Sequence, residues 1–464
     1  MANAKYLIGA SIVAAAIVAT PLVISKQIDS KLEENQRLLE KNGFKQEIIS
    51  KSGYLTGKRT FTLEISDAKK ARDFMLNALV AKNAQYKLFA QSLKDETNEG
   101  INEAFNGLGF KGEMITSHLF PSDAKVSLTL AKLPQGTQEE IAKDPKASGV
   151  VLPLLEKGIF GVDMTFSSDE KLKALKLKDI KESINVEEGT IDVDTQGHTL
   201  SLNERAGIVH GVVGIQKQNL GVKAADFTVQ SNLENFLYTF DYQDDLNNKG
   251  ELSLEHYAFD TKDAYSAVSF SMGAMKVTSS AEDVRKEWSL KADYALNNLS
   301  FTNALAEEVK LNTLLANLSL KGLQSESIKK IQADYNAMVL APESGGEKAL
   351  IDDFVTLVRH GMVFDFNIGL KALSGTLALK DVSIKTTLQI AKNDFSDQQS
   401  PLALIGLLDV TSKVKIHKED RATLEALQLT APQDFELGRA EGDYFVYDVT
   451  FKQGVISVNG QIIQ

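Results

Sequence analysis

The 464-residue chain contains no cysteine. This absence excludes disulfides, thiolate metal sites, iron–sulfur clusters and cysteine nucleophiles together. It is compatible with an oxidising compartment but does not by itself indicate one. The chain has only eight prolines and one tryptophan, so no proline-rich linker separates domains.

Positive charge is also scarce relative to negative charge. The 51 Lys and Arg residues face 62 Asp and Glu residues, which gives a formal net charge of −11. Nucleic-acid affinity depends on Lys and Arg side chains that neutralise phosphates. The sequence therefore predicts no nucleic-acid partner.

Cofactor and nucleophile motifs are missing or stand in the wrong context. Gly107–Gly112 matches G-x-G-x-x-G. Dinucleotide binding requires this motif directly after a strand, but here it follows a helical pattern. Residues 53–60 resemble a P-loop that is one residue short, with Arg59 where Ser or Thr must meet Mg²⁺. No G-x-S-x-G elbow occurs. We therefore assign no catalytic residue and no cofactor-binding residue, and we expect no cofactor.

Metal-ligand spacing is absent as well. No histidine lies within four residues of another; the six are His118, His198, His210, His256, His360 and His417. Asp241, Asp244 and Asp245 lie in a predicted loop, but a calcium loop needs regularly spaced oxygen ligands and a final Glu. A solvated turn is the preferred interpretation, and no metal ligand is assigned. A site assembled from distant strands stays open as an alternative.

The most distinctive feature that is present is an uncharged run, Tyr6–Ile24. As a helix its nineteen residues would rise about 28 Å, close to the ~30 Å hydrocarbon thickness of a bilayer. Its Leu, Ile and Val residues favour insertion by about 3–5 kcal/mol in total. We predict an uncleaved signal-anchor, with the membrane as a partner through residues 6–24. The alternatives are a signal peptide cleaved after Ala19 and a buried core helix.

The orientation of this segment is less directly encoded. Lys5 precedes the run, whereas Lys26, Lys31, Arg37 and Lys41 follow it. The positive-inside rule alone would place the following part inside, but long domains translocate largely regardless of charge. We predict that the bulk of the chain lies outside the cytoplasm.

The predicted fold class is α+β: an N-terminal transmembrane helix followed by a body dominated by an extended antiparallel β-sheet with helical insertions. Strands with alternating apolar residues recur every ten to fifteen residues between Ala124 and Phe301. In one of them Trp288, Tyr294 and the apolar residues between them occupy every second position. The expected parts are residues 1–24 as cytoplasmic tip and signal-anchor, 25–43 as a solvated stalk helix, 44–123 as first strand and helical insertion, 124–301 as antiparallel β meander, and 302–464 as helical insertion and C-terminal strands.

Helices are expected where apolar residues follow a helical period. Asp67 should cap a helical region that runs to about Phe105, and Gly43 should end the stalk helix. Residues 303–338 and 347–360 are also predicted to be helical. The chain should close with a hairpin that turns at Gln453–Gly454.

This closing hairpin resembles that of the YdgA-like family of bacterial envelope proteins, a family of unknown function. The shared run is Gly454–Gln461, GVISVNGQ; Tyr54, Gly57 and Phe61 resemble a second run of the family, with Phe further from Gly. His118–Pro121, HLFP, resembles a His-Gly-Pro-Phe-Pro run without its Gly and first Pro. The resemblance implies a single-pass protein of the bacterial inner membrane with its bulk in the periplasm. It implies no activity.

The apolar strand face is the only predicted feature large enough to bind something. It is either a core, covered by the helices of 67–105 and 303–360, or a partly open surface for lipid or another envelope protein. We therefore expect a non-enzymatic envelope role in binding or scaffolding, with lipid as one candidate ligand. The alternative is an envelope hydrolase with a carboxylate-based site assembled from distant residues. Buried acids with raised pKa values in a cleft would favour that alternative.

Overall fold

The computed structural model divides into two compact units. Unit 1 comprises Met1–Asn203 and Val212–Ala225, and unit 2 comprises Glu204–Gly211 and Asp226–Gln464. The structure describes residues 28–52, 56–82, 105–117, 123–143, 145–167, 169, 171–186, 189–305, 307–340, 346–375, 378–396, 401–426 and 436–463. The predicted membrane segment 6–24 lies outside these residues, and so do Tyr54, residues 83–104 and His118–Pro121.

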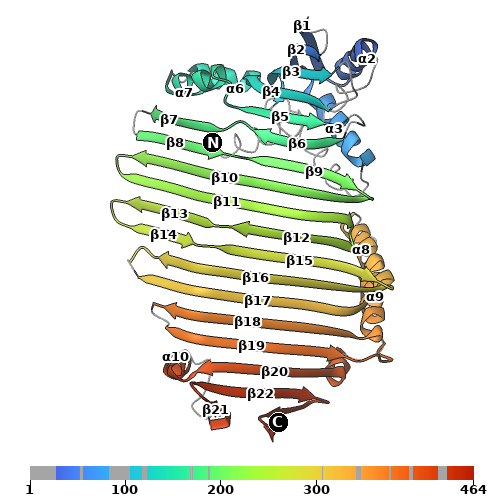
Figure 1. Cartoon of the computed structure of the whole chain (residues 1–464), viewed down its shortest axis with the longest axis vertical. Helices are drawn as coiled ribbons and strands as arrows, with labels where there is room; N and C mark the ends of the chain where they lie inside the picture. Colours follow the sequence, from blue (N-terminus) through green and yellow to red (C-terminus); the bar gives the residue numbers. More distant parts are fainter. Residues whose placement is uncertain are drawn as a thin grey trace. The chain divides into compact units, whose positions relative to one another are not determined.

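Unit 1 is an antiparallel sheet with four described helices (Figure 1). Its helices are α2 (Ile28–Lys41), α3 (Ala68–Lys82), α6 (Gln135–Lys143) and α7 (Pro145–Glu156). Its strands are β1 (Phe44–Ser52), β2 (Thr56–Ile65), β3 (Gly109–Ser117), β4 (Ala124–Lys132), β5 (Gly161–Phe166), β6 (Leu172–Leu177), β7 (Ile180–Val186), β8 (Gly189–Gln196) and most of β9 (Thr199–Arg205) and β10 (Ile208–Ala224). Strands β1 to β6 pair in chain order, β6 continues to β9, and β8 pairs with both β7 and β10.

The core of unit 1 lies between this sheet and its helices. Leu63, Leu128 and Phe166 are at most 2% exposed, because strand alternation directs them to the same buried layer. Leu39 of α2 is fully buried in this layer. The helix expected at 25–43 is therefore present, but it packs onto the core and is not a solvated stalk.

Two local predictions in unit 1 are confirmed. Gly43 follows the end of α2 with a φ of +85°, the left-handed conformation that favours glycine after a helix. Asp67 caps α3, since its Oδ1 accepts a hydrogen bond of 3.0 Å from the backbone N–H of Lys70. That backbone hydrogen bond also lowers the pKa of the Asp67 carboxyl.

Unit 2 is a longer antiparallel meander (Figure 1). Its strands are β11 (Phe227–Asp244), β12 (Asn247–Leu254), β13 (His256–Asp263), β14 (Ala267–Met272), β15 (Met275–Val284), β16 (Glu287–Thr302), β17 (Glu308–Gln324), β18 (Met362–Ser374), β19 (Leu379–Ile390), β20 (Leu408–His417), β21 (Arg439–Glu441), β22 (Tyr444–Lys452), β23 (Val455–Val458) and β24 (Gln461–Ile462). Its helices are α8 (Ser325–Leu340), α9 (Gly346–His360), α10 (Arg421–Ala426) and the 3₁₀ turns η4 (Pro401–Leu407) and η5 (Lys418–Asp420).

Pairing in unit 2 follows the chain closely. Strand β11 pairs with both β12 and β13. Strand β12 pairs with β15, and β13 pairs with β14. Strands β14 and β15 both pair with β16. From β16 the order is β17, β18, β19, β20, β22, β23 and β24, and β21 pairs with β22. The predicted turn at Gln453–Gly454 is confirmed: both residues have positive φ and connect β22 to β23.

Several strands of unit 2 contain a residue that interrupts the two-residue alternation. Asn298 of β16 has a φ of +54° and Ala372 of β18 a φ of +51°. Around Asn298, the apolar residues Leu296 and Leu299 are three positions apart in the sequence. The alternation of apolar and polar side chains therefore restarts at this point.

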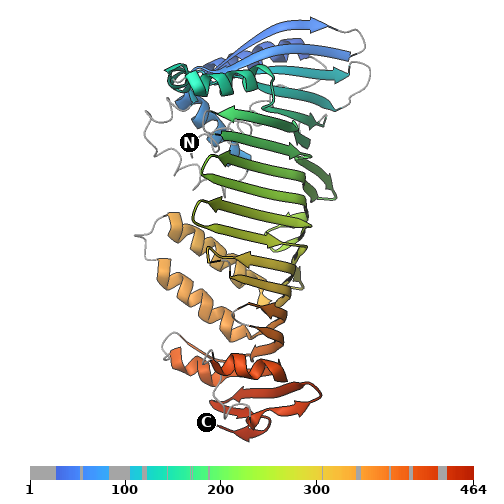
Figure 2. The same cartoon turned by 90° about the vertical axis from the view of Figure 1, so that its left-hand side faces the viewer.

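The helices of unit 2 lie on one side of its sheet (Figure 2). Val355 and Val358 of α9 pack against Ile390 of β19, with Leu404 of η4 beside them. Leu424 of α10 packs against Ile416 of β20. The strand residues at these contacts belong to one face by register, so this face is covered at the strand ends.

The predicted fold class is wrong. Strands make up well over half of the residues that the structure describes and helices a much smaller share, which makes this a mainly β protein instead of an α+β protein with a transmembrane helix. Among the residues that the structure describes, no helix is both long enough and apolar enough to cross a membrane. The large antiparallel sheet itself is as expected.

One misassigned segment contributes to this difference. Residues 303–338 were expected to be helical, and α8 confirms the second half, but the first half forms β17. Leu311 and Leu314 are three residues apart, which matches a helical stripe. In the structure they pair with Leu373 and Leu370 of β18, on either side of its left-handed residue Ala372. The break in strand alternation therefore imitates a helical period.

Candidate functional site

The sheet of unit 2 has one predominantly apolar face on the side of its helices. The pairs Val277–Tyr294 and Leu318–Phe366 link β15 to β16 and β17 to β18 on this face. We define the apolar face by Tyr238, Phe240, Leu252, Val277, Leu290, Tyr294, Leu296, Leu314, Leu318, Phe366 and Ile368.

This apolar face is not a closed core. Leu290 is 38% exposed and Tyr294 is 43% exposed, and the other defining side chains are half-buried. Helices α8 and α9 also carry exposed Tyr335, Ile351 and Phe354. Because fully packed cores leave little apolar surface in contact with water, the face offers an apolar surface for binding.

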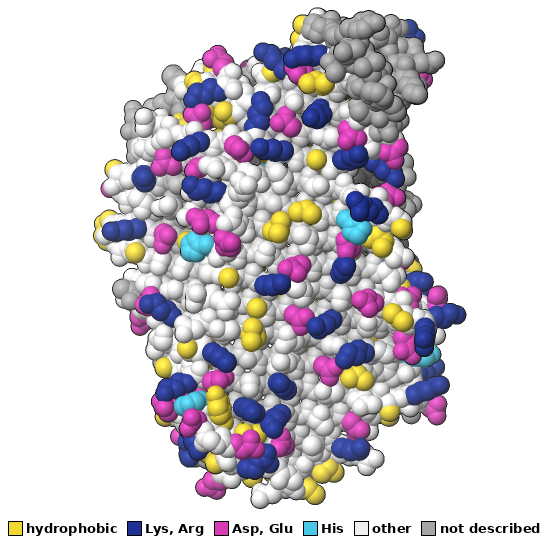
Figure 3. Space-filling view, viewed as in Figure 1, with side chains coloured by type: hydrophobic (Ala, Val, Ile, Leu, Met, Phe, Trp, Pro, Cys, Tyr) yellow, Lys and Arg dark blue, Asp and Glu magenta, His cyan; other side chains and the backbone are white. Residues whose placement is uncertain are grey.

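The opposite face is polar (Figure 3). Lys, Arg, Asp and Glu side chains are spread over it, and hydrophobic side chains on it are few and separate (Figure 3). Strand register aligns its residues into two rows. The first row is Thr239, Glu251, Thr278, Asp293, Asn317, Asn367, Lys385, Lys413 and Asp448, and the second is Asp241, Lys249, Ser280, Lys291, Ser319, Asp365, Thr387, Thr411, Thr450 and Ser457.

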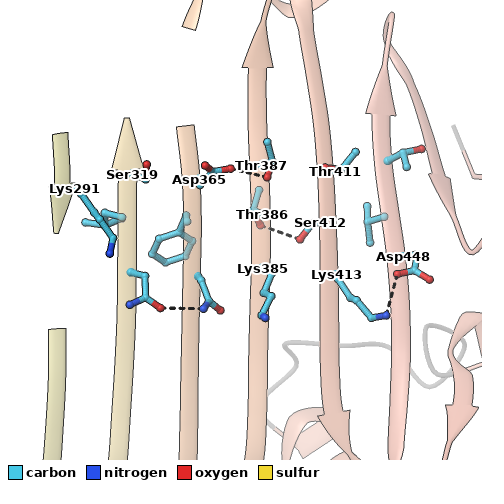
Figure 4. Close-up of a pocket in the computed structure, with 16 residues that line it drawn as sticks. Lys291, Ser319, Asp365, Lys385, Thr386, Thr387, Thr411, Ser412, Lys413 and Asp448 are labelled. Atoms are coloured by element: carbon cyan, nitrogen blue, oxygen red, sulfur yellow. Dashed lines mark hydrogen bonds and ion pairs between the residues drawn. The ribbon is translucent and has the colours of Figure 1, made fainter. Parts of the chain in front are cut away.

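A trough of about 400 Å³ lies between these rows, over β16 to β22 (Figure 4). The residues between the rows, including Leu318 and Phe366, direct their side chains to the apolar face, so their backbone forms the floor. We define the trough by its two walls: Asn317, Asn367, Lys385, Lys413 and Asp448 on one side, and Lys291, Ser319, Asp365, Thr387, Thr411 and Thr450 on the other.

Hydrogen bonds connect side chains along the trough. Asn367 Nδ2 donates to Asn317 Oδ1 at 3.0 Å, and Asn317 Nδ2 donates to Asp293 Oδ1 at 2.8 Å. On the other wall Thr387 Oγ1 donates to Asp365 Oδ1 at 2.8 Å (Figure 4). These bonds fix the side-chain orientations on neighbouring strands and give the trough a defined polar lining.

Two carboxyls of this face, Asp293 and Asp365, are held in the ionised form. The hydrogen bond from Lys291 lowers the pKa of the Asp293 carboxyl, and the hydrogen bond from Thr387 lowers the pKa of Asp365. Within the described residues, every carboxyl whose pKa departs clearly from its ordinary value is shifted downward; none is raised. A general acid needs a raised pKa, so these residues lend no support to the hydrolase hypothesis.

These lowered pKa values predict a loss of stability in acid. A carboxyl with a lowered pKa in the folded state stabilises the fold above its ordinary pKa, and the contribution disappears as the pH falls through the folded-state pKa. We expect the urea midpoint of unit 2, followed by Trp288 fluorescence, to stay nearly constant from neutral pH to about pH 5. The urea midpoint should decrease once the pH drops below 3.8, the ordinary pKa of an Asp carboxyl. In Asp293→Asn the fall should be shallower; an identical pH profile would contradict the assigned role of Asp293.

Among the residues that the structure describes, none from the motifs considered in the sequence lines the trough. Gly107 has a φ of +81° in the turn before β3; the helical segment that it was expected to end lies outside the described residues. Asp244 accepts hydrogen bonds from the backbone N–H groups of Leu246 and Asn247 in the β11–β12 turn, as a solvated turn predicts. His210 contacts Asp241, which also pairs with Lys249. No group of three potential metal ligands occurs among the residues that the structure describes.

The comparisons identify the family of this protein. A family model described as "Bacterial protein of unknown function (DUF945)" matches residues 4–464. The chain belongs to this family. In the other comparisons, no curated protein and no solved structure matches the chain. Membership in the family agrees with the expectation of a bacterial protein of unknown function, and it assigns no activity to either face of unit 2.

Sequence reasoning missed the trough. Each strand carries a visible polar alternation, such as Lys291 and Asp293 between apolar neighbours. The rows arise only when the strands are aligned in register, because their members come from separate strands between β11 and β23. Alternation could have indicated a polar face, but not which residues are neighbours.

Proposed function

We propose that this chain is a membrane-attached protein of the bacterial envelope, with its bulk in the periplasm, that binds lipid without catalysing a reaction. The observation that carries this proposal is the half-exposed apolar face of unit 2. Localisation to the inner membrane is supported by the uncharged run at residues 6–24 and by the resemblance of Gly454–Gln461 to the YdgA-like envelope family.

The dimensions of the apolar face suit an acyl chain. Four inter-strand spacings separate β12 from β18, which is about 19 Å at ~4.8 Å per spacing. An acyl chain spans half of a bilayer core of ~30 Å, or about 15 Å. The face is therefore long enough to bind one extended chain across its strands.

The chemistry of this face favours lipid over a peptide. A peptide that adds to a sheet needs an unpaired strand edge. Strands β16, β17 and β18 are paired on both sides, so the centre of the face offers no such edge. It offers apolar contact from residues such as Leu314 and Ile368, and this contact is all that an acyl chain requires.

A charge on the apolar face should remove bound lipid. Tyr294→Lys places an ammonium group at a 43% exposed position, so the fold should tolerate it. A lysine among acyl chains costs about 2.5–3.5 kcal/mol, less where the side chain reaches water, so we expect at least about tenfold less lipid per protein. The measurement is lipid mass spectrometry after purification of the full chain in mild detergent.

The matched control is Thr278→Lys. Thr278 is cross-strand partner of Asp293 on the polar face, so the new lysine meets a carboxylate and not the lipid. Lipid content should match that of the unmodified chain. A protein that purifies without lipid, or an equal loss of lipid in both variants, would contradict the proposal. Co-purification of a stoichiometric protein partner in place of lipid would instead indicate a scaffolding function.

A further inference from the structure

We propose that the trough on the polar face of unit 2 binds an acidic oligosaccharide, with an anionic group of the ligand between Lys385 and Lys413. This proposal does not depend on lipid binding, because the trough and the apolar face are opposite sides of the same strands. It rests on the shape of the trough, on a pair of lysines that nearby carboxylates compensate only in part, and on the hydrogen-bonding rows beside them.

The trough has the dimensions of a site for a short linear ligand. Its walls extend from Lys291 on β16 to Thr450 on β22, across five inter-strand spacings, or about 24 Å. Its volume of about 400 Å³ falls within the range of roughly 300–1,000 Å³ that is usual for ligand sites. Because it runs perpendicular to the strands, a bound chain would contact one or two residues of each.

The two lysines repel each other, and no structural benefit of placing them side by side is evident. Lys385 and Lys413 are directly opposite each other on β19 and β20. Like charges in this position destabilise a sheet. Lys415 lies two residues further along β20, on the same face. A protein under selection for stability alone would replace one of these residues, so their combination indicates a bound anion.

Nearby carboxylates compensate Lys413 only in part and Lys385 not at all among the described residues; Asp448 is the cross-strand partner of Lys413. Asp448 Oδ1 is 3.9 Å from Lys413 Nζ, at the limit of an ion pair, and Asp448 Oδ2 is 3.1 Å from Arg439 Nη2. Lys385 is exposed and has no ion pair within the described part of the chain. By contrast, Lys291 at the other end of the trough is 2.9 Å from Asp293. The free positive charge therefore concentrates at β19 and β20.

The surrounding groups match sugar hydroxyls. Ser319, Thr387, Thr411 and Thr450 line one wall, and Asn317 and Asn367 line the other. Hydroxyl and amide groups both donate and accept hydrogen bonds, as do the hydroxyls of a saccharide. The Asn367–Asn317–Asp293 chain holds its amides in place, which reduces the ordering cost of binding.

Other polyanions fit less well. Asp365 and Asp448 also line the trough, so a continuous polyanion such as a nucleic acid would meet repulsion on both sides of the lysines. The net charge of −11 opposes nucleic-acid binding further. A ligand with separated anionic groups and hydroxyls between them avoids this repulsion, and an acidic oligosaccharide has that composition.

The test is isothermal titration of the full-length protein in mild detergent with three probes: trigalacturonate, neutral maltotriose and inorganic phosphate. We expect saturable, salt-sensitive binding of trigalacturonate, and at least tenfold weaker binding of maltotriose and of phosphate. The double variant Lys385→Gln/Lys413→Gln should bind trigalacturonate at least tenfold more weakly. Binding of phosphate as tight as that of trigalacturonate would overturn the saccharide proposal and leave a simple anion site.

The control is Lys249→Gln/Lys276→Gln, which removes two lysines from the polar face outside the trough. Each of these lysines is paired with a carboxylate, Asp241 or Glu251. This variant should bind trigalacturonate as the unmodified chain does. Equal loss in both double variants, or no binding of trigalacturonate at all, would overturn the proposal. The thermal midpoint of unliganded Lys385→Gln/Lys413→Gln should not fall appreciably, since the change relieves repulsion between the two lysines and removes only the long, exposed Lys413–Asp448 ion pair. This result would show that lost binding does not reflect unfolding.

Discussion

Phe166→Ala is expected to destabilise unit 1 by about 3–5 kcal/mol. Phe166 is 1% exposed and packs in the cluster that also contains Leu63 and Leu128. The substitution removes the ring and leaves a cavity that paired strands on both sides cannot close by collapse. Since whole domains are stable by only about 5–15 kcal/mol, this loss is a large fraction of the total.

Hydrogen exchange of peptides from β2 to β5, measured over a urea series, would quantify this effect. The matched control is Phe227→Ala, because Phe227 of β11 in unit 2 is 45% exposed. It should cost about 1 kcal/mol or less, in proportion to the smaller apolar area removed from water. Equal costs for the two substitutions would contradict the assignment of the main core to unit 1.

Gly43→Ala is the second change with a large expected effect, roughly 2–5 kcal/mol. Gly43 has a φ of +85°, so an alanine there is strained. Its added Cβ would also lie 2.3 Å from the backbone carbonyl oxygen of Asp67. This oxygen belongs to the start of α3, and the carbonyl of Gly43 itself accepts hydrogen bonds from Ser66 and Asp67. The clash therefore displaces the junction that joins α2, β1 and α3.

The control for this prediction separates backbone strain from the clash. Gly454 has a φ of +80°, and an added Cβ would meet nothing within 4 Å. Gly454→Ala should therefore cost only the conformational strain, about 1–2 kcal/mol. Urea denaturation of both variants, with hydrogen exchange to locate the affected unit, measures the difference. A similar cost for the two variants would show that the Asp67 carbonyl can move without penalty.

Local structure could be predicted where short-range physics dominates. The stop at Gly43, the cap at Asp67 and the turn at Gln453–Gly454 each depend on backbone conformation or on a hydrogen bond within three residues. The antiparallel strands follow from the alternation of apolar and polar residues. These features need no knowledge of the partner strand, so the chain encodes them directly.

Predictions failed where a local pattern had two structural solutions. The three-residue interval between Leu311 and Leu314 fits a helix, and it also fits a strand whose alternation restarts. Pairing of β17 with β16 and β18 selects the strand. The local apolar spacing could not reveal this pairing, because the partner residues lie tens of residues away in the sequence.

The sequence by itself determined the antiparallel architecture, the absence of thiol chemistry, the acidic charge and the turns that connect the strands. Only the tertiary structure decided which strands become neighbours, whether the apolar face is covered, and that Lys385 is opposite Lys413. The physical reason is that alternation specifies which side of its own strand a residue occupies. Register between strands, which brings separate residues into one row, depends on the contacts of the whole sheet.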